Sequence, residues 1–347
     1  MNTPKFRRAV RAGVAAMAVA AALWAAGPAR AAGAASASVV GRTLHIKGTG
    51  GPDNIALALA DPNLLLIRLT DGTVEQFDRG TFDSIDVALE GGGDHFNGNG
   101  LAISQPSTID GDGGDDSITG TGAGDVIDGG GGDDTILAGA GDDVITGGGG
   151  RDFVVGGVGH DTAFLGGGTD TFLWNPGEGS DDVHGGGGTD TLLFNGANIG
   201  ETMSLSAAGP VAVFLRSPGN VVMNNDGVEI LDLHALGGAD LITVNDTTGT
   251  DMGEADIDLS AAGDGGAGDT LADLVTVNGT SGDDAVDVVG HGTTVDVSGL
   301  QPETHITGAD PTDQLQVDTL DGNDTVTVDP SANALIGVTV DLGPGQH

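Results

Sequence analysis

The chain has 347 residues, of which 65 are Gly, and it contains no Cys, no Tyr and only 11 Lys and Arg against 51 Asp and Glu. A formal net charge of −40 excludes non-specific nucleic-acid binding and disfavours adhesion to anionic membranes by charge alone. The glycine content excludes a wide core of large side chains and favours a stack of short strands, and without Cys no disulfide can supply stability.

The first 31 residues have the pattern of a secretory signal peptide. Four basic residues up to Arg11 precede an apolar run over residues 14–26, and Ala29-Arg30-Ala31 then forms an A-x-A cleavage site. The run is too short to span a bilayer comfortably, and a membrane anchor is the alternative interpretation. We therefore expect residues 1–31 to be removed on export and the protein to be secreted.

Residues 32–110 form an N-terminal flank in which short phrases of Gly, Asp and a following apolar residue recur without a fixed period. Two of these phrases, at 48–57 and 91–98, contain Asp53 and Asp94. Helical periodicity is nearly absent, so we expect longer, irregular β-solenoid coils here. The two aspartates are explained equally well as turn formers and as metal ligands, because neither has a close partner 18 residues away.

A nine-residue repeat begins at Gly111 and defines the central segment, residues 111–195. Nine blocks follow the pattern Gly-Gly-x-Gly-x-Asp-x-U-x, in which U is apolar, and only Trp174 and Asn175 interrupt them. Position five accepts Arg in one block and His in another, so it is not a position for side-chain metal ligands. Position six is Asp in every block. The aspartates are Asp116, Asp125, Asp134, Asp143, Asp152, Asp161, Asp170, Asp181 and Asp190.

Position eight is apolar in every block and is the predicted core position. One inward side chain between two outward ones makes a minimal β-strand, and the preceding glycines make a turn. Two repeats then form one coil of 18 residues, and coils stack as parallel strands about 4.8 Å apart. The sequence therefore predicts an all-β protein, a right-handed parallel β-roll flanked on both sides by irregular β-helical coils.

Alternate repeats lie on the same edge of such a roll, so their aspartates stack on each other. Two unit charges about 5 Å apart repel by ~3 kcal/mol at an effective dielectric constant of ~20, and a divalent cation between them reverses the sign. Only hard oxygen ligands surround this position, from carboxylates and turn carbonyls, which favours Ca²⁺. Zinc and copper would need thiolates or regularly placed imidazoles.

The repeat pattern resembles the RTX, or hemolysin-type, calcium-binding repeat of bacterial extracellular proteins. The resemblance implies a parallel β-roll in which Ca²⁺ lies between successive turns, held by the nine position-six aspartates and turn carbonyls. Four gaps on one edge and three on the other imply up to about seven ions. Leu165, Pro176 and Ala123 depart from the pattern, and the Trp174-Asn175 insertion is expected to disturb the gaps 161/181 and 170/190.

Residues 196–347 form a C-terminal flank of degenerate repeats. Phrases similar to the repeat recur around Asp240, Asp284 and Asp324, separated by short β-branched runs. We expect the β-solenoid to continue here in irregular coils. As in the N-terminal flank, these three aspartates fit turn formation and metal binding equally well.

Position nine points outward in the predicted roll and is apolar in four consecutive coils of one face: Leu137, Val155, Leu173 and Leu193. One interpretation is that a loop covers these residues or that strand twist turns them inward. The other is a docking surface for a second protein or a cell-wall polymer.

The predicted function is calcium binding coupled to folding outside the cell, with no catalytic residues and no cofactor besides Ca²⁺. A structural or adhesive role at the cell surface is the second interpretation, and a carbohydrate-active enzyme is the third. No phosphate-binding Gly-Lys-Ser/Thr, no His-Glu-x-x-His and no Gly-x-Ser-x-Gly occurs. Polysaccharide epimerases that carry similar repeats use a catalytic Tyr, and this chain contains no Tyr.

Overall fold

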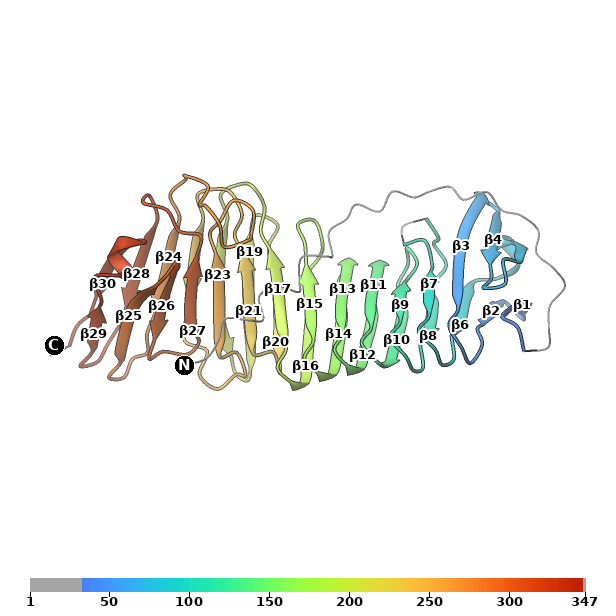
Figure 1. Ribbon diagram of the computed structural model, residues 1–347, viewed down its shortest axis with the longest axis horizontal. Coiled ribbons are helices and arrows are strands. Elements are labelled where there is room, and N and C mark those ends of the chain that lie inside the picture. Colours follow the sequence, from blue (N-terminus) through green and yellow to red (C-terminus); the bar gives the residue numbers. More distant parts are fainter. Residues whose placement is uncertain (1–32, 101, 346–347) are drawn as a thin grey trace.

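The protein is an elongated rod built from two long β-sheets that run along its length (Figure 1). The structure, a computed structural model, describes residues 33–100 and 102–345, so the expected signal peptide, residues 1–31, lies outside the described residues. Within the described ranges there is no α-helix, and the helical turns are the 3-10 segments η1 (Arg79–Thr81) and η2 (Ala332–Ala334). The predicted all-β class is confirmed.

Among the described residues, each sheet contains fifteen strands. From the N-terminal end of the rod, the first sheet contains β1 (Ser36–Val40), β2 (Thr43–Lys47), β6 (Ser84–Ala88), β8 (Ser107–Asp110), β10 (Val126–Gly131), β12 (Val144–Gly150), β14 (Thr162–Gly168), β16 (Asp182–Gly188), β20 (Val221–Asp226), β19 (Val211–Ser217), β18 (Thr202–Ala208), β22 (Leu241–Val244), β24 (Leu274–Asn278), β28 (Gln314–Asp318) and β30 (Gly337–Asp341). In the same direction, the second sheet contains β5 (Val74–Asp78), β4 (Leu64–Arg68), β3 (Asn54–Asp61), β7 (His95–Asn97), β9 (Ser117–Thr119), β11 (Thr135–Ala140), β13 (Phe153–Val158), β15 (Thr171–Trp174), β17 (Thr191–Asn195), β21 (Ile230–His234), β23 (Glu254–Asp258), β27 (Glu303–Thr307), β26 (Thr294–Ser298), β25 (Ala285–His291) and β29 (Thr325–Val328).

In the repeat block the chain alternates between the two sheets, one strand per repeat, and every second repeat pairs in parallel. Ile127 lies opposite Ile145 in the first sheet, and Ile136 lies opposite Val154 in the second. All nine position-eight side chains are at most 1% exposed, so they form the core between the sheets as predicted. With one apolar side chain per repeat at this position, the core of the block is thin.

Antiparallel hairpins lengthen the coils of both flanks. Three-stranded meanders are formed by β3–β4–β5 near the N-terminal end and by β18–β19–β20 and β25–β26–β27 in the C-terminal flank. The tight turns contain Gly209, Asn220 and Gly292, whose φ angles of 69°, 54° and 65° suit short hairpin connections. The flanks are therefore irregular as expected, and their coils are lengthened by inserted antiparallel strands and by long loops such as residues 259–273.

Aromatic packing accommodates the two-residue insertion in the repeat block. Trp174 is fully buried, stacks on Phe194 with ring centroids 4.2 Å apart, and donates its indole N–H to the carbonyl oxygen of Gly179 at 2.8 Å. Phe214 of β19 meets Phe194 edge-on, with centroids 4.6 Å apart. The core therefore thickens where the repeat block meets the C-terminal flank.

Candidate metal centre

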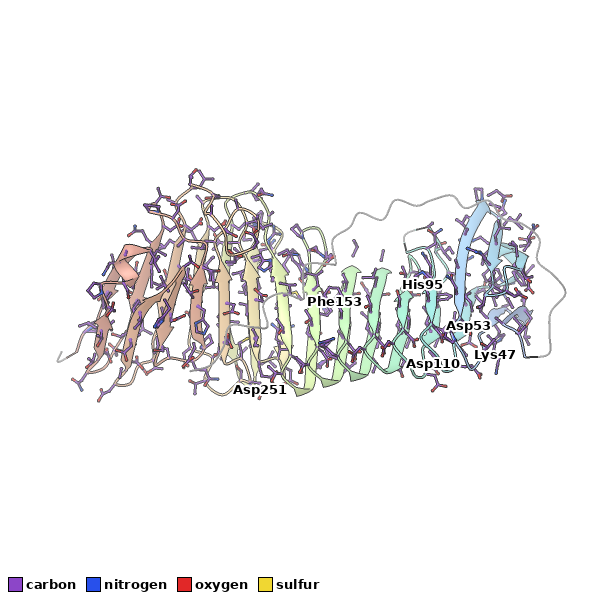
Figure 2. The ribbon with its side chains drawn as sticks, in the orientation of Figure 1. Lys47, Asp53, His95, Asp110, Phe153 and Asp251 are labelled. Atoms are coloured by element: carbon purple, nitrogen blue, oxygen red, sulfur yellow. The ribbon has the colours of Figure 1, made fainter. Side chains whose placement is uncertain are left out.

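The nine repeat aspartates occupy the same place in every coil, directly before a strand. Asp116 and the aspartates of alternate repeats precede strands of the second sheet, while Asp125 and its alternates precede strands of the first. Each of the nine is at most 3% exposed. Figure 2 shows few side chains along the outside of this block, where most turn positions are glycine, and dense side chains over both flanks.

Each edge carries a carboxylate ladder, in which the backbone N–H of one aspartate donates a hydrogen bond to Oδ1 of the aspartate one coil further along. Asp134 N–H, for example, donates to Asp152 Oδ1 at 2.9 Å. The bonds across the insertion, to Asp181 Oδ1 and Asp190 Oδ1, are also 2.9 Å long. The expected disturbance of these two gaps is therefore wrong, because the extra residues extend the loop after β15 and leave the stacked edges in register.

The second carboxylate oxygen is the unusual feature of the ladders. In eight of the nine repeat aspartates Oδ2 is buried and accepts no hydrogen bond from any residue that the structure describes. An unsatisfied buried polar atom costs about 1–3 kcal/mol, and more when it is charged. These oxygens therefore need a partner that the described chain does not supply. The eight residues are Asp116, Asp134, Asp143, Asp152, Asp161, Asp170, Asp181 and Asp190.

Burial raises the pKa of the ladder carboxyl groups well above the usual value of 3.8. The pKa reaches about 6 for Asp116, Asp134 and Asp152 and about 7 for Asp143 and Asp181. Loss of water is the main cause, neighbouring carboxylates add to it, and the backbone N–H bond to Oδ1 opposes it only in part. The ladders therefore resist carrying their full negative charge unless a cation accompanies it.

Glycine-rich turns stack against one another beside the ladders. A Cβ atom placed on Gly150 would lie 2.0 Å from the carbonyl oxygen of Gly132, and one on Gly159 would lie 1.8 Å from that of Gly141. Both glycines also have positive φ angles, 141° and 158°. Side chains are thus excluded at these two positions. A Cβ on Gly129 would meet both Asp134 Oδ2 at 2.6 Å and the carbonyl oxygen of Gly147 at 2.7 Å, so a backbone carbonyl lies near this ladder carboxylate.

This donor set fits calcium. The oxygens are anionic carboxylates and neutral carbonyls, which Ca²⁺ prefers, and glycine turns leave room for an ion of flexible coordination. The buried carboxylate oxygens without a hydrogen-bond donor are the groups that a cation would satisfy. The residues present therefore fit a set of Ca²⁺ ions between coils.

Asp125 differs from the other eight. Its Oδ2 accepts the backbone N–H of Thr121 at 2.6 Å, and its Oδ1 accepts the N–H of Ser107 at 2.6 Å and the Thr121 hydroxyl at 2.8 Å. Thr121 stands where most repeats have the second glycine. The chain itself thus satisfies this carboxylate at the start of its ladder.

The ladders extend into the N-terminal flank. Asp53 N–H donates to Asp94 Oδ1, and Asp94 N–H donates to Asp116 Oδ1, both at 2.7 Å. These residues are 41 and 22 positions apart, because the β3–β4–β5 meander and a loop lengthen their coils. A search for partners at a spacing of 18 therefore missed them. At the other end, Asp190 N–H donates to Glu229 Oε2 at 2.7 Å.

The C-terminal flank contains a further ladder that sequence reasoning missed, apart from the candidate Asp240. It consists of Glu201, Asp240, Asp273 and Asp313, linked by bonds of 2.7, 2.8 and 3.0 Å. It lies before β18, β22, β24 and β28, on the same sheet as the ladder of Asp143. The sequence feature that could have revealed these residues is an acidic residue directly before a strand with alternating apolar residues, without the Gly-Gly-x-Gly pattern.

Asp284 and Asp324 form a shorter pair of the same kind. Asp284 N–H donates to Asp324 Oδ1 at 2.9 Å, and the two residues precede β25 and β29 of the second sheet. Asp284 Oδ2 accepts the backbone N–H of Thr280 at 2.8 Å, which repeats the arrangement of Thr121 and Asp125. All five flank aspartates singled out from the sequence thus stack on another carboxylate.

A mixed cluster lies on a different surface, the outer face of the second sheet. Ligand atoms of Glu254, Asp256 and His305 lie within 4.8 Å of one another, and all three side chains are half-buried. His305 Nδ1 lies 2.7 Å from Asp296 Oδ1. Burial lowers the pKa of His305, but the hydrogen bond with Asp296 and the neighbouring carboxylates together raise it above its usual value. The imidazole distinguishes this cluster from the ladders, which contain oxygen ligands alone.

The apolar stripe at position nine is only partly exposed. Leu137 and Val155 are half-buried, while Leu173 and Leu193 are only 9% and 7% exposed. Their strands pair in register, so the four residues are neighbours on the outer face of the second sheet. On the first sheet of the repeat block, the apolar side chain of Phe164 is 44% exposed, which is more than Leu173 or Leu193 on the second sheet.

Stacked coils that bury rows of aspartates beside glycine turns define a calcium-binding type of β-roll. A family model for the RTX calcium-binding nonapeptide repeat, in four copies, matches residues 110–145, 137–172 and 177–195. Residues 110–195 thus contain RTX-type calcium-binding nonapeptide repeats. No curated protein sequence matches it.

RTX repeats bind Ca²⁺, and proteins that carry them are typically secreted. In the part of the chain that the structure describes, no helix has the length and apolar character needed to cross a membrane.

Proposed function

We propose that the protein works outside the cell as a calcium-binding protein in which Ca²⁺ binds between the stacked turns and drives folding of residues 111–195. The unpartnered, buried Oδ2 atoms of eight repeat aspartates carry this proposal. The ion would supply the positive charge that the ladders lack and a ligand field of hard oxygens. The seven gaps between stacked repeats could hold up to about seven ions, one in each gap. Asp125 is expected to contribute least to calcium binding.

Coupling between binding and folding follows from the thin core. Each repeat orders nine residues, several of them glycines with high conformational freedom, around one inward apolar side chain. Without calcium, repulsion along the ladders adds to this entropic cost. Both flanks contain larger buried side chains, such as Phe82, Phe96 and Phe214, so they depend less on the ion.

An extracellular setting supports the same proposal. The first 31 residues have the pattern of an export signal, and calcium concentrations outside cells suit modules that bind Ca²⁺ in the ~0.1–1 mM range. The role proposed is structural rather than enzymatic, since the regular carboxylates are assigned to the metal. An activity screen on acidic and neutral polysaccharides would separate it from a carbohydrate-active enzyme.

Hydrogen exchange of the full chain, read by mass spectrometry with calcium and with a chelator, tests the coupling. Amides of β11, β13 and β15 should be protected in calcium and exchange at least about tenfold faster in chelator, because their coils lose the ion that cancels the ladder charge. The flank strands β4 and β26 should change much less and serve as the internal control. Equal protection of the repeat strands in both buffers would refute the proposal.

A further inference from the structure

Asp240 lies outside the nonapeptide block and has the same bonding pattern as its aspartates. It is fully buried, its Oδ1 accepts the N–H of Glu201 at 2.7 Å, and its own N–H donates to Asp273 Oδ1 at 2.8 Å. Its Oδ2 is buried and accepts no hydrogen bond from any residue of the described ranges. A fully buried carboxylate oxygen is therefore left without a donor between two coils of the C-terminal flank.

The carboxylates that begin the other ladders are satisfied by the chain. In Asp53, Asp125 and Asp284, Oδ2 accepts the backbone N–H of a threonine four residues earlier. The corresponding residue before Asp240 is Leu236, which has no hydroxyl and a φ angle of 66°. The hydrogen bond that satisfies Oδ2 in those three aspartates is thus missing at Asp240.

Glu201, the neighbour of Asp240 in the ladder, is neutralised differently. Arg216 is buried against it and donates from Nε to Oε1 at 2.6 Å, while the N–H of Ala197 donates to Oε2 at 2.7 Å. Arg216 is also the last Lys or Arg in the sequence. No lysine or arginine of the following segment can therefore approach Asp240.

The turns around Asp240 are packed as closely as those of the nonapeptide block. A Cβ atom on Gly238 would lie 2.3 Å from the carbonyl oxygen of Ile199 in the preceding coil. Asp269 lies beside the same turn, where its Oδ2 accepts the N–H of Gly238 at 2.7 Å. A carboxylate and a closely packed backbone carbonyl thus lie at the turn that precedes Asp240, and this oxygen-only character favours Ca²⁺ over zinc.

We propose that Asp240 Oδ2 is a ligand of an additional Ca²⁺ ion bound between coils of the C-terminal flank, outside the nonapeptide repeats. This proposal rests on the calcium binding proposed for the repeat block. It makes the metal-binding part of the rod longer than the segment that the family model matches. Asp94 and Asp324 have the same unpartnered Oδ2, which shows that the feature is not confined to the repeats.

Counting the bound ions tests this site. Full chains of wild type, Asp240→Asn and Asp287→Asn are dialysed to equilibrium against a fixed, saturating calcium concentration, and calcium per chain is measured by elemental analysis. Asp287 is an exposed aspartate on β25, so its variant controls for the loss of one surface charge. Asp240→Asn should bind one ion fewer than wild type, and Asp287→Asn should bind the same number.

An unchanged count in Asp240→Asn would overturn the additional site while leaving the repeat sites in place. A wild type that binds no calcium at all would instead refute the proposed function itself. A measurement on the wild type alone guards against a variant that fails to fold: calcium should increase protection of the amides of β22 and β24. Unchanged protection there, with a calcium response in β11 and β13, would also overturn the site.

Discussion

The two oxygens of each ladder aspartate have different roles. Oδ1 accepts a backbone N–H from the adjacent coil and so holds the coils in register, while Oδ2 is unpartnered in eight of the nine repeats. Asparagine can keep the first interaction through its carbonyl oxygen, but it loses the anionic oxygen that a cation needs. Asp→Asn substitutions therefore separate calcium binding from coil stacking at single residues.

Asp134 and Asp125 should respond differently to this substitution. Asp134→Asn should weaken calcium binding at its gap roughly 10- to 100-fold, since an interaction with a charged group is worth about 1.5–3 kcal/mol. Asp125→Asn should change calcium affinity by less than about twofold, because Thr121 and Ser107 already satisfy this carboxylate. Calorimetric titration of both variants with Ca²⁺ measures the difference. Equal losses would show that Asp125 binds the ion as the other aspartates do.

At the level of strands and turns, the nine-residue period predicted the repeat block closely. It identified the core residues at position eight and the two edges of stacked aspartates, because every coil there has nearly the same length. The same reasoning failed where hairpins or long loops lengthen the coil. Glu201 and Asp240 are 39 residues apart, and Asp240 and Asp273 are 33 apart, so no fixed spacing reveals that they stack.

The residues that were missed share a second cause. Neither Asp273 nor Asp313 has Gly-Gly-x-Gly at the spacing that the repeat has before its Asp, and Glu201 replaces the expected Asp. Only pairing in three dimensions shows that they continue one edge of the first sheet. Sequence periodicity therefore finds a site built from identical coils, whereas a site built from unequal coils needs the sheet register.

A pair of neighbouring glycines tests how closely the turns must stack. Gly149 and Gly150 are the last two residues of β12. A Cβ on Gly150 would collide with the backbone of Gly132, whereas one on Gly149 meets nothing within 4 Å. Gly150→Ala should lower the free energy of unfolding in saturating calcium by about 2–4 kcal/mol, from overpacking and an unfavourable φ of 141°.

Gly149→Ala is the matched control and should change the free energy of unfolding by less than ~0.5 kcal/mol. Urea denaturation of both variants at one calcium concentration provides the comparison. If Gly150→Ala were as stable as Gly149→Ala, the close packing of Gly150 against the backbone of Gly132 would be contradicted.

For the whole molecule, the rod consists of a calcium-dependent middle between two flanks with thicker cores. The middle segment has rows of buried acids whose charge nothing in the described chain balances, since eight Oδ2 atoms there have no donor. Two kinds of cation can remove that charge. Calcium can bind between the coils, or protons can neutralise the carboxylates one by one. The stability of the rod should therefore depend on pH and calcium together.

The pH dependence without calcium follows from the raised pKa values. Because the pKa of Asp134 is about 6 and that of Asp143 about 7 in the folded chain, against 3.8 for an ordinary Asp, the folded state binds protons more tightly than the unfolded state. This contribution to stability is fully present below about pH 4 and is lost as the pH rises through 6 to 7. In calcium-free buffer the repeat block should therefore melt at a higher temperature at pH 5 than at pH 8, as followed by circular dichroism.

With calcium the order should reverse, since protons compete with Ca²⁺ for the same carboxylates and the ion binds more tightly as the pH rises. The double variant Asp134→Asn, Asp152→Asn controls for the general charge of the surface, because it removes two ladder carboxylates and leaves the exposed acids in place. Its melting temperature in calcium-free buffer should change less between pH 5 and pH 8 than that of the wild type. A wild type that melts higher at pH 8 than at pH 5 without calcium would contradict the idea that ladder charge opposes folding.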